Sequence, residues 1–166
     1  MRPYRIRPDA PAEAEPLFEV HRRERGEEVA RAIRADRGLG AADGLVFRFD
    51  RALFTTSYPA HHLTAQAAVQ GRALQMADRL FRAYFTDGLH IAGPGVLARL
   101  AAQVGVRQEP DLTAWLDAEL ASTGELGSDT GPVLFVDGVR LAHPEPSEDQ
   151  LLAGLREASR RGRNRH

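Results

Sequence analysis

The 166-residue sequence contains neither cysteine nor lysine. Without cysteine, these residues offer no catalytic thiol, no disulfide and no thiolate ligand for zinc. All 22 basic residues are arginine, which we attribute to codon composition rather than to 22 separate anion sites. Thiol–disulfide exchange is therefore excluded as a reaction of this stretch of chain.

Long apolar runs and a strong net charge are also missing. No apolar stretch approaches the roughly 18 residues that span a bilayer, and the opening MRPYRIRPDA lacks the basic-then-apolar order of a signal peptide. The net charge of -1 gives no long-range attraction to nucleic acid or to an anionic membrane. We expect a cytoplasmic protein that binds neither. Its length and hydrophobic content predict a single domain over residues 1–166.

Alternation of apolar and polar residues predicts a strand near the start of the chain. RPYRIRP places Tyr4 and Ile6 between arginines, and Pro8 ends the pattern. LVFRFD at 45–50 alternates in the same way and predicts a second extended segment.

The C-terminal region predicts a hairpin and a helix. VLFV and VRLA flank the dipeptide Asp137-Gly138, a sequence typical of a two-residue hairpin turn. Ser147 and Gln150 have the spacing of a capping box and predict a final helix behind them. Residues 160–166 are expected to form a frayed, solvated tail.

Helical spacing dominates the region between these ends, from 11 to 126. Gly26 should divide the first stretch into two helices. Pro59, Pro94 and Pro110 should each begin a later helix. Gly71 should end the helix that begins at Pro59, and Gly105 should end the helix that begins at Pro94. The residues expected to form the core of this helical block are Leu74, Ala77, Leu80, Phe81, Tyr84, Phe85 and Trp115. Helical insertions of this kind can also form one side of a cleft that binds an apolar ligand.

Two common site chemistries find little support. His61 and His62 are adjacent and point in different directions on a helix, and no His-x-x-x-His pattern completes a metal set. GLGAADG at 38–44 precedes an extended segment instead of opening a helix, so it does not match a phosphate-binding loop. We predict no metal and no cofactor.

The order strand, helices, hairpin, helix resembles the DsbA-like thioredoxin family, especially its FrnE-like branch, which is related to the 2-hydroxychromene-2-carboxylate isomerases. The resemblance implies an α/β, truncated thioredoxin-like fold. Residues 1–10 and 130–160 would form its thioredoxin-like part, and 11–126 a mostly helical insertion. The matching stretches are RPYRIRPDAP (2–11), FRFDRA (47–52), AHHLTAQAAVQG (60–71), LFRAYFTDG (80–88), VLARLAAQVG (96–105) and GPVLFVDG (131–138).

The resemblance also implies a binding cleft. It predicts a cis Gly131–Pro132 bond in the loop that faces the family's redox centre. The alternative is that Pro132 begins an edge strand in trans. His61 matches a family histidine and is the candidate base, although a lone histidine on a helix face is more often structural. The cleft candidates are Ser57, Tyr58, His61, Thr130, Gly131 and Pro132.

The family's opening strand, Cys-x-x-Cys turn and first helix have no counterpart in this sequence. In the thioredoxin sheet that strand lies between the one predicted at 4–8 and the hairpin. Without that strand, peptide groups of the neighbouring strands lack hydrogen bonds. Each such group that is buried lowers the stability of the fold by about 1–3 kcal/mol. The two sheet pieces could close on each other, or a second copy or another chain could supply a strand. The natural protein could also start upstream of Met1.

Two functions remain after these observations. The first is a family member without redox cysteines that binds a partner chain or a small apolar ligand in the cleft. The second is an enzyme of the family: a glutathione-dependent isomerase, or a disulfide oxidoreductase whose N-terminal segment lies outside this sequence.

Overall fold

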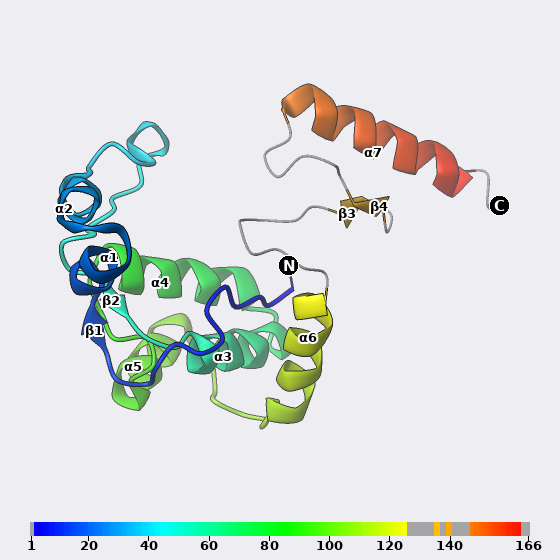
Figure 1. Ribbon diagram of the computed structural model, residues 1–166. Coiled ribbons are helices and arrows are strands. Elements are labelled where there is room, and N and C mark those ends of the chain that lie inside the picture. The colour runs from blue at the N-terminus through cyan, green and yellow to red at the C-terminus, as the bar shows by residue number, and fades with distance from the viewer. Residues whose placement is uncertain (1, 126–134, 137–138, 141–146, 164–166) are drawn as a thin grey trace. The chain divides into compact units, whose positions relative to one another are not determined.

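The computed structural model describes residues 2–125, 135–136, 139–140 and 147–163. Contacts divide the chain into two compact units, Met1–Thr123 and Gly124–His166, and each is described by itself (Figure 1). The single domain over 1–166 stays a prediction.

Residues 2–8 have no regular secondary structure, so the strand predicted at 4–8 is wrong. A strand needs a neighbour for its peptide groups, and this segment has no ladder partner among the described residues. Side chains hold it instead. For example, the Thr123 hydroxyl donates to the Pro3 carbonyl over 2.7 Å.

The first regular elements form a small antiparallel ladder and two short helices. β1 (Glu15–Pro16) pairs with β2 (Leu53–Phe54), and β1 leads into α1 (Leu17–Arg25) and α2 (Glu27–Ala35). Gly26 separates these helices, as predicted, with φ at 88°. The segment at 45–50 is not a strand; it lies between the 3-10 turn η1 (Ala41–Asp43) and β2.

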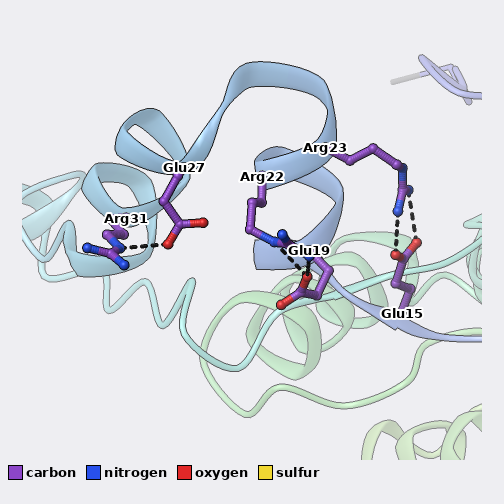
Figure 2. A network of polar contacts seen from close by, with 6 residues as sticks. All are labelled: Glu15, Glu19, Arg22, Arg23, Glu27 and Arg31. Carbon is purple, nitrogen blue, oxygen red and sulfur yellow. Dashed lines mark hydrogen bonds and ion pairs between the residues drawn. The ribbon is translucent and has the colours of Figure 1, made fainter.

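Ion pairs cover the exposed faces of α1 and α2 (Figure 2). Exposed pairs typically contribute at most about 1 kcal/mol each, so they do not fix the helices in place. Burial does: Val20 and Ala30 are 2% and 1% exposed. The pairs drawn are Glu19–Arg22, Glu27–Arg31 and Glu15–Arg23, at 2.6, 2.7 and 2.7 Å.

The core of the first unit is formed by α3 (Tyr58–Val69), α4 (Ala73–Phe85) and α5 (Pro94–Val104). Pro59 and Pro94 lie in the first turns of α3 and α5, as predicted. Gly71 and Gly105 follow the ends of α3 and α5, at φ 70° and 73°. The largest fully buried side chains are Leu63, Met76, Leu100 and Leu116.

The apolar stripe predicted for α4 is partly wrong. Leu74 and Phe81 are 76% and 58% exposed, whereas Met76 and Ala83 are fully buried. Leu74 and Met76 are two residues apart and therefore point to opposite sides of the helix. Met76, Leu80 and Ala83 share the face toward the core. Leu74 and Phe81, seven residues apart, share a different face.

α6 (Thr113–Glu125) begins three residues later than the predicted start at Pro110. Asp111 explains the boundary, because its carboxylate accepts hydrogen bonds from the Thr113 N–H (3.0 Å) and hydroxyl (2.6 Å). This is an Asx turn just before the helix, whose first hydrogen bond runs from the Leu116 N–H to the Leu112 carbonyl (2.8 Å). The Glu109–Pro110 bond just before it is cis.

The second unit contains the predicted hairpin and final helix. β3 (Phe135–Val136) pairs antiparallel with β4 (Val139–Arg140), and Val136 opposite Val139 confirms the two-residue connection. α7 (Glu148–Arg163) begins with the predicted capping box. The Ser147 N–H donates to Gln150 Oε1 (2.8 Å), and the Gln150 N–H donates to Ser147 Oγ (3.3 Å).

Several C-terminal predictions fall partly or wholly outside the described residues. Thr130 and the predicted cis bond at Gly131–Pro132 are among them, as are residues 164–166 of the predicted frayed tail. α7 runs to Arg163, so 160–163 are helical because the final helix continues through them. No helix within the described part of the chain combines the length and the apolar character needed to cross a bilayer.

Candidate functional site

Three of the six predicted cleft residues lie together at the start of α3. Ser57 precedes the helix, Tyr58 is its first residue, and His61 lies one turn along. The other three, 130–132, lie outside the described residues. The structure therefore describes only half of the residues predicted to line the cleft.

Local hydrogen bonds begin α3 at this point. The Tyr58 N–H donates to Thr56 Oγ1 (3.3 Å), and the His61 N–H donates to the Ser57 carbonyl (3.0 Å). Pro59 fits the first turn, where a missing N–H loses no helical bond. The Ser57 hydroxyl caps nothing and makes no other hydrogen bond to the described residues. It is available to a ligand.

Tyr58 links this site to α6. Its hydroxyl donates a hydrogen bond of 2.7 Å to Asp117. That bond to the carboxylate is the largest cause that raises the pKa of Tyr58, with burial second. The phenol therefore stays protonated at neutral pH and fixes α3 against α6.

His61 is half-buried and neutral at pH 7. Burial is the main cause that lowers its pKa below the ordinary histidine value. The positive charge of Arg5 lowers that pKa further, and a backbone hydrogen bond with Tyr4 opposes both effects. A nucleophile paired with a base requires a hydrogen bond between the two. Within the described residues, the Ser57 hydroxyl does not bond to the His61 ring.

Arg5 belongs to the site, although sequence reasoning missed it. Its guanidinium lies over the Tyr58 ring, 5.7 Å from the centroid, and its Nη2 donates to Thr56 Oγ1 over 3.0 Å and to the Pro8 carbonyl. Among the described residues, Arg5 Nε is buried without a hydrogen-bond partner. The sequence contains 22 arginines, and nothing in it distinguishes Arg5 from the others. Its role comes from tertiary contact with α3.

Other histidines of the unit hold loops in place. His90 Nε2 lies 2.9 Å from the Ala12 carbonyl, and His62 Nε2 accepts from the Leu112 N–H over 3.1 Å. These contacts join segments far apart in sequence, so both histidines have structural roles. Within the described ranges, no group of three or more His, Cys, Asp or Glu could hold a metal ion.

The aromatic residues predicted as core divide into two groups. Phe85 packs edge-on against Tyr84 and Phe47, with centroids 4.7 and 5.0 Å apart. Phe81 and Trp115 are 58% and 49% exposed, so the prediction is wrong for them. The reason at Trp115 is helical geometry: Leu116 faces the core, and the preceding position is rotated about 100° away.

Comparison with known proteins gives a consistent result. A family model described as the DSBA-like thioredoxin domain matches residues 1–123. A crystal structure of a probable DsbA oxidoreductase from Streptomyces coelicolor has a TM-score of 0.80 and 21% sequence identity. That match covers 95% of this chain and 74% of the other. No curated protein matches in sequence. At this identity, the structural similarity shows the fold alone.

Proposed function

The chain belongs to the family of DSBA-like thioredoxin domains, and from that premise we propose that it acts by recognising a polypeptide instead of exchanging thiols. The α/β thioredoxin-like fold is the predicted one, and it is mostly helical. None of its 166 residues is a cysteine. What the chain offers instead is a set of unused hydrogen-bonding groups.

The observation that carries the proposal is the backbone of residues 5–7. Within the described part of the chain, the N–H groups of Arg5, Ile6 and Arg7 donate no hydrogen bond. Ile6 is also 65% exposed. Unpaired peptide groups beside an exposed β-branched side chain favour the addition of a strand from another polypeptide.

The occupant that we propose is a second copy of this chain. Each copy brings the same unpaired segment, so antiparallel pairing of the two through their Ile6 edges satisfies the Ile6 N–H of both copies at once. Arg5 and Arg7 flank Ile6 in each copy, and pairing therefore brings like charges together. Because salt screens that repulsion, association should strengthen as ionic strength rises.

Sedimentation of wild type and two variants tests this proposal. Ile6→Pro removes a peptide N–H and should abolish association, because proline cannot donate to a ladder. Ile6→Val keeps the peptide donor and the β-branched shape, so it should associate like wild type. A wild type that stays monomeric at every concentration and salt level would contradict the proposal. So would an Ile6→Pro variant that still associates.

The finer family assignment is a separate hypothesis. We infer membership of the FrnE-like branch from the six matching stretches, of which LFRAYFTDG at 80–88 is the most specific. A glutathione-dependent isomerase related to that branch would bind glutathione, and calorimetric titration with glutathione tests this. A small apolar ligand in the cleft stays a prediction, to be tested by native mass spectrometry of the purified protein.

A further inference from the structure

Arg5 carries its positive charge without a carboxylate partner. Its Nη2 donates to the Pro8 carbonyl and to the Thr56 hydroxyl, both uncharged. Within the described residues it forms no ion pair. Its neighbour Arg7, by contrast, pairs with Glu24 over 3.1 Å. The charge at Arg5 is left uncompensated in this part of the molecule.

The same side chain has a donor that no described group uses. Arg5 Nε is buried and makes no hydrogen bond. A buried donor without a partner lowers stability, and in native structures it calls for an explanation such as a bound water or ion. A guanidinium recognises carboxylates with particular strength, because its donors match the two carboxylate oxygens.

Uncharged polar groups lie next to this cation. Arg5 contacts residues on both sides of Ser57, namely Thr56 and Tyr58. The Ser57 hydroxyl is unbonded, and it stands at the N-terminus of α3, where the helix dipole favours negative charge. His61 is close enough for the charge of Arg5 to act on it.

We propose that Arg5 and Ser57 bind the carboxylate group of a small organic acid next to His61. The guanidinium of Arg5 supplies the positive charge of this site. The carboxylate of Asp117, which accepts from the Tyr58 hydroxyl, disfavours a ligand that carries more than one negative charge. This site needs no partner chain and goes beyond the proposed recognition of a polypeptide.

Nuclear magnetic resonance of the full chain tests this directly, with sodium benzoate as the probe. The Nε–Hε signal of Arg5 is assigned by its loss in Arg5→Lys. We expect this signal to shift saturably with benzoate and to stay unmoved by sodium chloride at the same ionic strength. Bound benzoate should also raise the pKa of His61, because a nearby anion favours the imidazolium. A shift of equal size with chloride would overturn the site.

Variants separate the site from general charge effects. Arg5→Gln should weaken benzoate binding at least about tenfold, while Arg7→Gln should bind like wild type. If Arg5→Gln does not fold, Arg5→Lys must bind more weakly than wild type and Arg7→Lys must not. Unchanged binding in the Arg5 variants would overturn the proposal. If benzoate does not bind, the proposed association of two copies of the chain is still decided by its own sedimentation test. The two proposals can therefore be rejected independently.

Discussion

The Tyr58 hydroxyl of α3 lies 2.7 Å from Asp117 of α6 and donates a hydrogen bond to it. The two residues are 59 positions apart in sequence, so the bond closes a long loop of chain. It also places a carboxylate at one end of the tyrosine ring, while Arg5 covers the ring face.

Removing this hydroxyl should destabilise the first unit. We expect Tyr58→Phe to lower the free energy of unfolding in urea by about 1 kcal/mol, the usual contribution of one hydrogen bond. Tyr84→Phe is the matched control, because the Tyr84 hydroxyl has no partner among the described residues. Equal losses in the two variants would show that the bond to Asp117 contributes nothing.

The ionised carboxylate of Asp50 should stabilise the folded protein, and this stabilisation should be lost at low pH. The hydrogen bond from Arg48 is the main cause that lowers the pKa of Asp50 to about 2, and Arg37 adds to it. The contribution is therefore complete above the ordinary pKa of 3.8 and is lost as the pH falls toward 2. Asp50→Asn should lower the melting temperature at pH 7 more than at pH 2.5. Asp43→Asn, which removes a carboxylate that has no ion pair among the described residues, should show no such difference.

Gly88 should tolerate no side chain. Its φ is 69°, and an added Cβ would lie 2.6 Å from Arg51 Cβ and 2.9 Å from the Arg51 carbonyl oxygen. Gly71 has nearly the same φ, 70°, but open space around it. Gly71→Ala should cost about 1–2 kcal/mol for the left-handed backbone alone. Gly88→Ala should cost more, because the clash adds to that strain. Equal unfolding free energies would contradict the close approach to Arg51.

Burial of His61 should make stability depend on pH near neutrality. Its pKa in the folded protein lies below the unfolded value of about 6.5. The unfolded chain then binds more protons, so this contribution is complete above pH 6.5 and is lost as the pH falls below it. His61→Gln should flatten the stability profile between pH 5 and 7. A His61 that titrates at or above the ordinary value would contradict this prediction.

Local signals in the sequence predicted the helices well. Gly26, Pro59 and Gly105 act through backbone geometry that depends on a few neighbouring residues, and each lies at a predicted boundary. The Ser147–Gln150 capping box was predictable for the same reason.

Features that depend on distant contacts were missed. The alternation at Tyr4 and Ile6 predicts a strand, yet a strand forms only where another supplies its bonds. The exposure of Phe81 and Trp115 depends on how α4 and α6 turn toward the core. The role of Arg5 arises only where residues 2–8 meet α3.

Amide hydrogen exchange at Arg5, Ile6 and Arg7 across a concentration series tests the central claim, recognition by backbone pairing, most directly. The account predicts fast exchange at all three amides in dilute protein and growing protection of the Ile6 amide as concentration and salt increase. Arg5 and Arg7 should stay fast, because their N–H groups point to the opposite edge of an extended strand. Exchange at Ile6 that stays fast at every concentration, or protection already complete in dilute protein, would contradict it.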